Sequence, residues 1–272
     1  MRTPKMAYPY ILWMLVFTVV PILLIVHYTF TDAAGLRFTT ANIERFFTPL
    51  YLNILRRSVV LAMQATGICL LLGYPVAYVL ALKEFRDRNV LIFLFVVPMW
   101  MNFLIRTYAW FSILGNNGVL NNLLAVFGLG PVRILFTETA VLLGLVYTFL
   151  PFMILPIYVS IQKIDTSLIE AAQDLGANSL NVFYKVIIPL SLPGVASGLT
   201  MVFMPAVATF LISNILGGAQ FILIGNLIEQ QFMTVGNWNF GAAISLMLMI
   251  LIFVFNVLFS LMNREQKEGT DV

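Results

Sequence analysis

Charged residues are scarce in this sequence, which is 272 residues long and only 10% Asp, Glu, Lys and Arg. Soluble domains carry about 25%. Together with a hydrophobic share of 61% and a mean hydropathy of +0.96, this scarcity excludes an ordinary soluble protein and predicts an all-α membrane protein. The net charge is only +3, and no basic run is interleaved with aromatic residues. Nothing in the composition therefore favours nucleic acid binding.

Residue types that carry catalysis or bind metals are almost absent. His27 is the only histidine and Cys69 the only cysteine, which excludes an internal disulfide and disfavours a metal cluster or a nucleophile–base pair. The chain also lacks G-x-x-x-x-G-K-[ST], H-E-x-x-H and G-x-S-x-G, so it has neither the loop that cradles ATP phosphates nor a common hydrolase motif. We expect no enzyme activity, no metal site and no cofactor bound by this chain.

Acidic residues are missing from the interior of the hydrophobic segments. Each Asp and Glu lies in a loop, in a tail or at the edge of a segment, as Glu138 does. Carriers driven by a proton gradient depend on intramembrane Asp, Glu or His, so this pattern disfavours them. It favours a passage whose energy comes from another subunit.

Hydrophobic segments long enough to cross a bilayer recur through a single membrane domain that spans residues 1–272. Each reaches or exceeds the roughly 20 residues that the hydrocarbon core requires. The first is too long for the apolar region of a signal peptide, which has about 7–15 residues, so we expect it to be retained. The six predicted spans are 8–30, 57–82, 90–114, 139–161, 191–215 and 238–262.

The distribution of Lys and Arg between the loops predicts the orientation. One side collects nine of them: Arg2, Lys5, Lys83, Arg86, Arg88, Lys163, Lys185, Arg264 and Lys267. The other side collects five: Arg37, Arg45, Arg56, Arg57 and Arg133. Because the cytoplasmic side carries the excess, we predict a multi-pass protein of the bacterial plasma membrane with both termini in the cytoplasm. Arg56 and Arg57 argue the other way, unless an interfacial helix holds them.

The longest polar interruption in the second half of the chain is the loop 162–190, which we predict to form two short helices. Ser167 and Glu170 make an S-x-x-E capping box, so the first helix should begin near Leu168. Gly176 is suited to end it in the left-handed conformation.

A second short helix follows in the same loop. Asn178 or Ser179 is a suitable N-cap, and Pro189 is expected to end the helix.

The first helix of the loop carries an apolar stripe. Because so short a helix is marginal in water, its stripe needs a partner, either this chain's own bundle or another protein. The stripe consists of Leu168, Ala171, Ala172 and Leu175.

The spacing in this loop resembles the EAA loop of the permease subunits of bacterial ABC importers. The matching residues are Glu170, Ala171, Ala172, Gly176, Val186, Ile188 and Pro189. The family usually has Ile and Leu where this chain has Val186 and Ile188. The resemblance implies the type I, MetI-like permease fold with six transmembrane helices. It also implies a cytoplasmic coupling helix in loop 162–190 that docks on a separate ATPase. The alternative is an ordinary amphipathic helix that closes back on the bundle.

Within that family the chain is similar to polyamine (spermidine/putrescine) permeases. The supporting stretches are 98–110, 150–153, 170–189, 217–219 and 223–226. The resemblance implies a second, homologous permease chain, two copies of an ATPase that binds ATP and Mg, and an extracytoplasmic binding protein. It also implies that five residues contact the ATPase, namely Glu170, Ala171, Ala172, Asp174 and Gly176.

The substrate path is predicted from polar and aromatic residues near the membrane. Arg106 is the only formal charge well inside a predicted span, and it either faces a cavity or a partner or extends to the interface. Glu229 attracts cations to the outer mouth, pairs with the binding protein or is simply solvated. Aromatic faces attract cations by about 0.5–2 kcal/mol each, which could compensate for the lack of mid-membrane acids; the alternative is that the partner permease supplies the carboxylates. The other candidates are Trp100, Asn102, Tyr108, Trp110, Tyr147 and Asn214.

Two alternative functions stay open. The first is an importer of the same class for another solute, such as an amino acid, ferric iron or an oxyanion, and Arg106 would suit an anion. The second is a self-sufficient channel or secondary carrier, which would need no docking helix.

Overall fold

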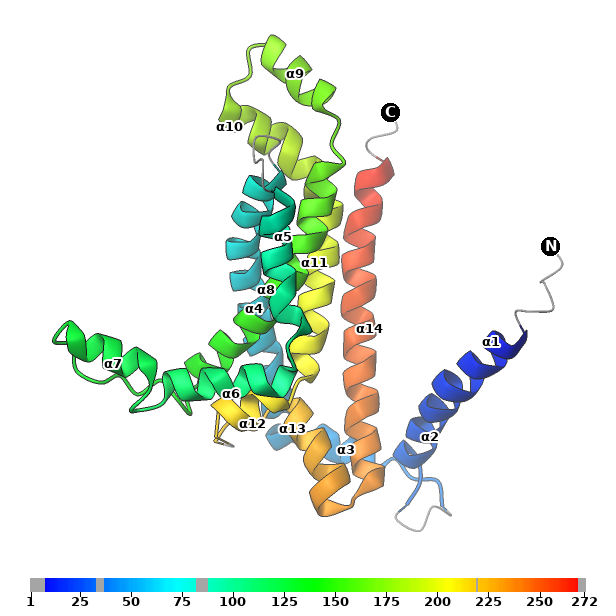
Figure 1. The fold of residues 1–272 in the computed structure, drawn as a ribbon. Helices are drawn as coiled ribbons and strands as arrows, with labels where there is room; N and C mark the ends of the chain where they lie inside the picture. Colours follow the sequence, from blue (N-terminus) through cyan, green and yellow to red (C-terminus); the bar gives the residue numbers. More distant parts are fainter. Residues whose placement is uncertain (1–7, 33–36, 82–87, 219, 269–272) are drawn as a thin grey trace.

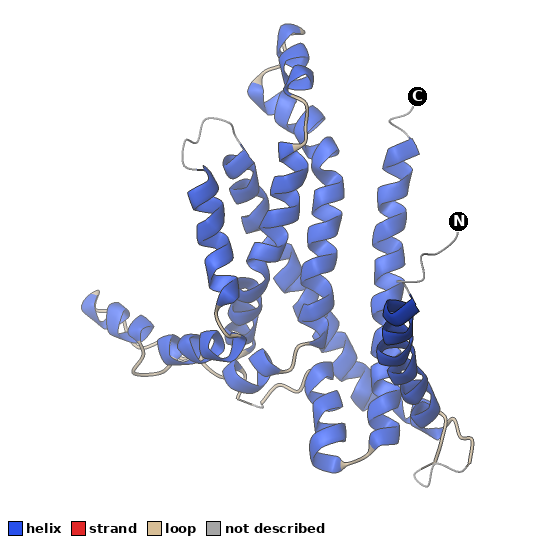
Figure 2. Cartoon of the chain, turned by 45° about the vertical axis from the view of Figure 1, so that its right-hand side comes forward, coloured by secondary structure: helices blue, strands red, loops and turns tan. Residues whose placement is uncertain are grey.

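Helices make up almost all of the chain that can be described (Figure 2). A computed structural model describes residues 8–32, 37–81, 88–218 and 220–268, and within them extended backbone pairs in an isolated antiparallel bridge between Thr31 and Phe38. Some residues used above lie outside the described ranges: Arg2, Lys5, Lys83, Arg86 and Ala219.

Five helices in the described ranges are long and apolar enough to cross a bilayer. Two of them contain a π-helical turn, η2 in the first and η4 in the fourth. The five are α1–η2–α2 (Tyr8–Met14, Leu15–Val19, Val20–Thr29), α4 (Pro49–Ala81), α8 (Glu138–Gln162), α10–η4–α11 (Ser179–Val182, Phe183–Ile187, Ile188–Ala208) and α14 (Trp238–Glu268).

The core lies where α8 packs between α4 and α11 (Figure 1). Met153 of α8 is fully buried there, and glycines of both neighbouring helices face it. A Cβ atom added to Gly198 of α11 would lie 2.7 Å from Met153 Sδ, and one added to Gly73 of α4 would lie 3.1 Å from Met153 Cγ. Small residues at these positions let the three backbones approach closely, as is common between membrane helices.

The first helix is attached to the last one. α14 packs against α2 and, more weakly, against α11. The Nδ2 atom of Asn239 donates to the carbonyl oxygens of Tyr28 and Thr31, at 3.0 Å each. In Figure 1, α2 therefore lies beside one end of α14, whereas α1 leans away from α14, and both lie apart from the α4–α8–α11 core.

The third predicted span, 90–114, is not one continuous helix. The chain forms α5 (Arg88–Val96), a 3-10 turn η3 (Val97–Trp100) and α6 (Phe103–Leu114), and α6 runs across the upright helices (Figure 1). Pro98 removes a backbone donor, and Met101 is extended, with φ −69° and ψ 142°. Asn102 then caps α6 by accepting from the Leu104 amide at 2.8 Å. Hydropathy alone does not register such a break, because the residues on both sides of it are apolar.

Two further boundaries differ from the predictions. Pro189 does not end the second helix of loop 162–190, because η4 leads directly into α11 and the helix runs on to Ala208. The wider π turn that precedes Pro189 accommodates a residue without an amide donor. The fifth predicted span, 191–215, in turn stops at Ala208, where Thr209 is extended, and α12 (Leu211–Leu216) follows.

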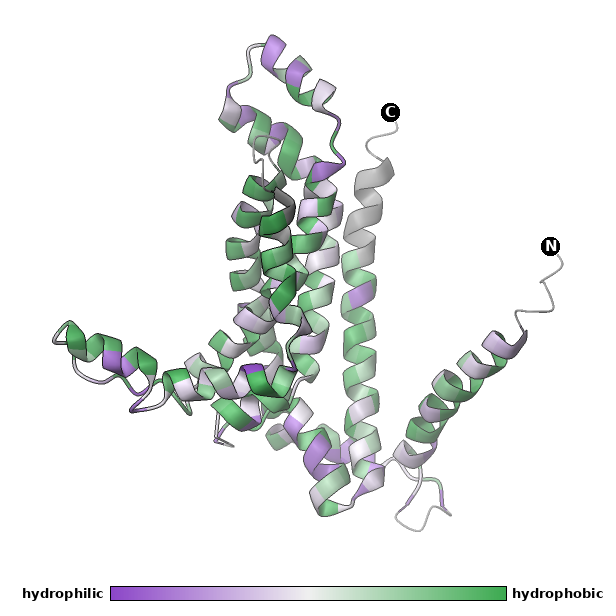
Figure 3. Cartoon of the chain, viewed as in Figure 1, coloured by the Kyte–Doolittle hydropathy of each residue, from purple (hydrophilic) through white to green (hydrophobic). Residues whose placement is uncertain are grey.

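Polar elements gather at the two ends of the bundle, while the helix shafts are apolar (Figure 3). One end holds α9 (Thr166–Asp174), α10 and the end of α14; the opposite end holds α3 (Ala41–Phe46), α12 and α13 (Ile224–Glu229) (Figure 1). Lys163 and Lys185 belong to the α9 end, whereas Arg45 and Arg57 belong to the other. The remaining short elements are α7 (Val119–Val126) and the π-helix η5 (Gln230–Val235).

Candidate functional site

The α9 end of the molecule carries the predicted docking helix. α9 begins at Thr166, two residues earlier than predicted, because Asp165 rather than Ser167 is the N-cap. The Asp165 carboxylate accepts from the Ser167 amide at 2.9 Å. Asn178 caps α10 by accepting from the Asn181 amide at 2.8 Å, which confirms that part of the sequence analysis.

Gly176 ends α9 in the predicted left-handed conformation, with φ +84°. Its amide donates to the Gln173 carbonyl at 2.8 Å, and the Ala177 amide donates to the Ala172 carbonyl at 3.0 Å. This pair of bonds is the Schellman arrangement, which reverses the chain and satisfies the last helix carbonyls. The turn therefore sets the direction in which α10 leaves α9.

The apolar stripe predicted for α9 is divided between two faces. Ile169 and Ala172 pack towards the core of this chain. Ala171 is exposed, as are Leu168 and Leu175, and Leu175 has 89% of its surface exposed. Among the five predicted ATPase contacts, Ala172 is the one that is half-buried; Glu170, Ala171, Asp174 and Gly176 are exposed. One face thus closes on the bundle while the other is free to meet a partner.

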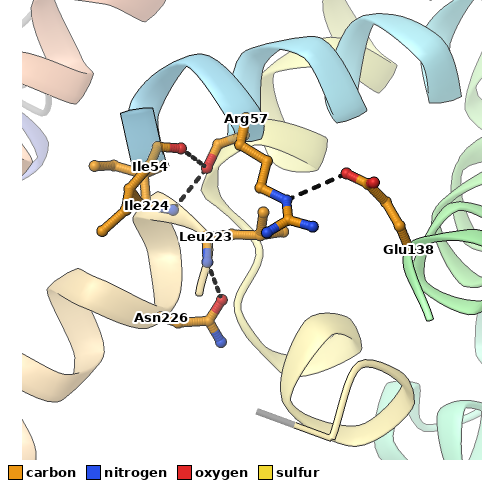
Figure 4. A network of polar contacts seen from close by, with 7 residues as sticks. Ile54, Arg57, Glu138, Leu223, Ile224 and Asn226 are labelled. Atoms are coloured by element: carbon orange, nitrogen blue, oxygen red, sulfur yellow. Dashed lines mark hydrogen bonds and ion pairs between the residues drawn. The ribbon is translucent and has the colours of Figure 1, made fainter. Parts of the chain in front are cut away.

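At the opposite end, a polar network joins three segments that are far apart in the sequence (Figure 4). Arg57 of α4 pairs with Glu138 of α8, Nε to Oε1 at 3.3 Å, and its guanidinium lies 4.3 Å from the centre of the Phe221 ring. The next residue, Ser58, accepts from the Ile224 amide at 2.7 Å. Two successive residues of α4 therefore hold the connection between α12 and α13.

Asn226 is the second centre of this network, and 7% of its surface is exposed. Its Oδ1 atom accepts from the Ser213 hydroxyl at 2.5 Å and from the Leu223 amide at 3.0 Å. Its Nδ2 atom donates to the Phe210 carbonyl at 3.0 Å and to Asn214 Oδ1 at 2.6 Å. With all these groups satisfied, Asn226 fixes the side chain of Asn214, one of the predicted path residues.

Two cavities adjoin this network and share Glu229 in their walls. One has a volume of about 450 Å³ and is otherwise lined by apolar and aromatic residues, among them Phe210, Phe232 and Trp238. The other has a volume of about 270 Å³ and includes Asn214 and Asn226. Asn214 and Glu229, which the sequence analysis named separately, thus line one cavity.

The predicted path residues around the broken third segment do not form one site. Trp110 of α6 and Tyr147 of α8 meet edge to face, with ring centres 5.2 Å apart. Trp100 has 76% of its surface exposed and pairs with Phe93 instead. Tyr108 is also exposed.

Arg106 does not extend to the surface, since only 8% of it is exposed. Its Nη1 atom donates to the Pro98 carbonyl at 3.2 Å, across the break between η3 and α6. Within the described residues, its buried Nε atom has no hydrogen-bond partner. Arg106 lines neither of the two cavities beside Glu229.

The sequence analysis did not predict that Ser58, Ser213 and Asn226 form this network. Each is a small polar residue in an apolar stretch, which in a membrane helix is common and carries little information. The sequence offered one signal, since Asn226 stands directly before the apolar pair Leu227 and Ile228. An amide in such a place is expected to be buried, and a buried amide requires hydrogen-bond partners.

A bundle of long apolar helices with polar elements at its two ends defines a multi-pass membrane protein. Residues 70–268 match the family described as "Binding-protein-dependent transport system inner membrane component". The chain belongs to this family.

Two curated relatives extend the match over most of the chain. Both are named "Spermidine/putrescine transport system permease protein PotB". The protein of Haemophilus influenzae is 42% identical over 93% of this chain and 92% of its own length. The protein of Escherichia coli K12 is 44% identical over 88% of this chain and 90% of its own length.

A solved structure supports the fold. A subunit of a bacterial ABC transporter "involved in the import of the acidic polysaccharide alginate" superimposes with a TM-score of 0.77, covering 96% of this chain and 94% of its own, at 18% identity. At that identity the likeness concerns the fold alone.

Proposed function

We propose that this chain is the membrane subunit of an ATP-driven importer of polyamines, spermidine and putrescine. The observation that carries the proposal is the identity of 42–44%, over about nine-tenths of the chain, with permeases named for these two solutes. The alginate importer is much less similar in sequence and says nothing about the substrate.

We propose that α9 is the coupling helix on which a partner ATPase docks. Its support is a solvent-facing surface with exposed Leu168, Ala171 and Leu175 beside Glu170 and Asp174. Exposed apolar side chains of this kind mark interaction sites. ATP and Mg would be bound by the ATPase, two copies of which serve this chain and a second, homologous permease. The ATPase must bind α9 with different affinities in its different nucleotide states, because only such a difference can drive a conformational cycle.

We propose six membrane crossings, five by the long helices and the third by the broken α5–η3–α6 segment. In this arrangement α9 and both termini face the cytoplasm, and α3, α12 and α13 face the binding protein outside. The placement of Lys163 and Lys185 at the α9 end supports it through the positive-inside rule. Arg57, which argued against it, is paired with Glu138 at the other end. Because Glu138 balances its charge, Arg57 on the outer side conflicts less with the proposed orientation.

The proposed substrate path runs from the outer network towards the broken third segment. We propose that Arg106 stabilises the break in the third segment, since its guanidinium donates a hydrogen bond to the Pro98 carbonyl. Arg106 was the residue that suited an anion, and its burial outside both cavities beside Glu229 removes that support for an anionic substrate. The residues proposed for the path are Trp100, Asn102, Tyr108, Trp110, Tyr147, Asn214 and Glu229.

The test is purification followed by reconstitution. An ATPase, a second permease and a binding protein should co-purify or assemble with this chain. The complex in proteoliposomes should then take up spermidine in an ATP-dependent, saturable manner that putrescine competes and amino acids do not. An assembled complex without saturable polyamine uptake would refute the substrate. Uptake that needs no ATPase would refute the class and favour a carrier or channel.

A further inference from the structure

Glu229 differs from the other carboxylates at the outer end of the bundle. Glu138 is paired with Arg57, and Glu44 accepts from the Thr40 hydroxyl at 2.8 Å. Glu229 is half-buried at the end of α13, and among the described residues no cation or hydrogen-bond donor meets its carboxylate. The carboxylate is thus open to a ligand that reaches the outer end of the bundle, and its charge suits a cation.

The larger cavity beside Glu229 suits an aliphatic chain. Its volume of about 450 Å³ lies within the range of small-ligand sites, about 300–1,000 Å³. Phe232 and Trp238 meet edge to face in its wall, with ring centres 5.4 Å apart. Such rings pack against methylene groups and also attract a cation over their faces.

The smaller cavity suits the N–H groups of an ammonium ion. Its wall includes Asn214, Asn226, Gln230 and Thr234 beside Glu229. An ammonium group has three donors and no acceptor, so one carboxylate and neighbouring amide or hydroxyl oxygens can satisfy it. Asn226 already has its partners within the protein. It therefore fixes its own part of the wall, and Asn214, Gln230 and Thr234 are left to accept from a ligand.

Arg57 is the cation that the described residues place beside this cavity, and it does not compete for Glu229. Arg57 lies over the ring of Phe221, which lines the smaller cavity. Its charge is already paired with Glu138. Arg57 therefore leaves the Glu229 carboxylate available to a cationic ligand.

We propose that Glu229 is the anchor of a binding site for a linear aliphatic amine at the outer end of this subunit. The carboxylate binds one ammonium group at the boundary of the two cavities. The methylene chain of the amine lies in the larger cavity, and polar side chains of the smaller one accept the remaining N–H groups. This inference rests on the proposed polyamine transport and assigns the substrate contact within it.

The test separates binding from transport. Binding of radiolabelled putrescine is measured on the assembled permease–ATPase complex in lipid nanodiscs without binding protein, and ATP-driven uptake is measured on the same complex with binding protein. Loss of a charged hydrogen bond predicts that Glu229→Gln raises the Kd for putrescine roughly tenfold. Glu229→Asp should retain part of the affinity because it keeps the charge.

Two further variants provide controls. Glu44→Gln removes a carboxylate at the same end and should leave the Kd unchanged. Met233→Gln changes an exposed residue in the wall of the larger cavity and should raise the Kd by less than Glu229→Gln does. Size-exclusion chromatography of each complex checks assembly.

The possible outcomes distinguish the two proposals. If the wild-type complex takes up polyamine but Glu229→Gln binds putrescine as tightly as wild type, the site is refuted and the function stands. The same holds if Glu229→Gln and Glu44→Gln weaken binding equally, or if the wild-type complex binds no putrescine while transporting it. If the wild-type complex transports no polyamine at all, both proposals fail.

Discussion

Replacing Gly176 with Val should uncouple this subunit from its ATPase without disrupting the bundle. The φ angle of Gly176 is +84°, which a side-chain-bearing residue adopts at a cost of about 1–2 kcal/mol. A Cβ atom at this position would meet no atom within 4 Å, so the whole cost is conformational. α9 has only nine residues, none of them buried, and cannot absorb the strain through its own stability.

The magnitude follows from that strain. A cost of 1–2 kcal/mol lowers the ratio of formed to unformed turn by roughly 5–30-fold. Both hydrogen bonds of the turn, from Gly176 to Gln173 and from Ala177 to Ala172, would be lost with it. The exposed face of α9 would then point in varying directions and dock less often. We expect stimulated ATPase activity and transport to fall together, with Gly176→Asn less affected because Asn tolerates this conformation.

A matched control lies at the far end of the molecule. Gly128, which follows α7, has φ +71° and likewise no atom within 4 Å of an added Cβ. Gly128→Val therefore imposes the same kind of strain away from α9 and should leave ATPase stimulation intact. The assay is ATP hydrolysis by the reconstituted complex with and without loaded binding protein, together with thermal unfolding in detergent. Full stimulation in Gly176→Val, or equal losses in both variants, would refute the reasoning.

Two predictions concern stability. Asn226→Ala should lower the free energy of unfolding by about 2 kcal/mol, because it leaves the Leu223 amide and Asn214 Oδ1 without their present partners; a variant as stable as wild type would show that the network adds nothing. Gly198→Leu should cost about 1–3 kcal/mol by overpacking against Met153, whereas Gly67→Leu, where an added Cβ meets nothing within 4 Å, should not. Thermal unfolding of the purified complex measures both, and equal melting of the two glycine variants would contradict the packing argument.

Local signals predicted the α9 region well, because that region is built from local interactions. The left-handed turn at Gly176 and the cap at Asn178 depend on residues within a few positions of each other. The N-cap was misplaced from Asp165 to Ser167, since both residue types cap helices and only the backbone decides between them. Pro189 was misjudged for a related reason, because the π turn before it is invisible in a hydropathy pattern.

The composition and hydropathy of the chain determined by themselves that it is a helical membrane protein, because only long apolar helices satisfy their backbone groups in lipid. The residue spacing in loop 162–190 predicts that this loop meets a partner, and that stays a prediction. Only the tertiary structure decided which polar groups come together. Arg57 and Glu138 are 81 positions apart and Ser58 and Ile224 are 166 apart, so their meeting depends on how α4, α8 and α13 pack. Glu229 lines both an apolar and a polar cavity because of the same packing. No local pattern in the sequence predicts this position.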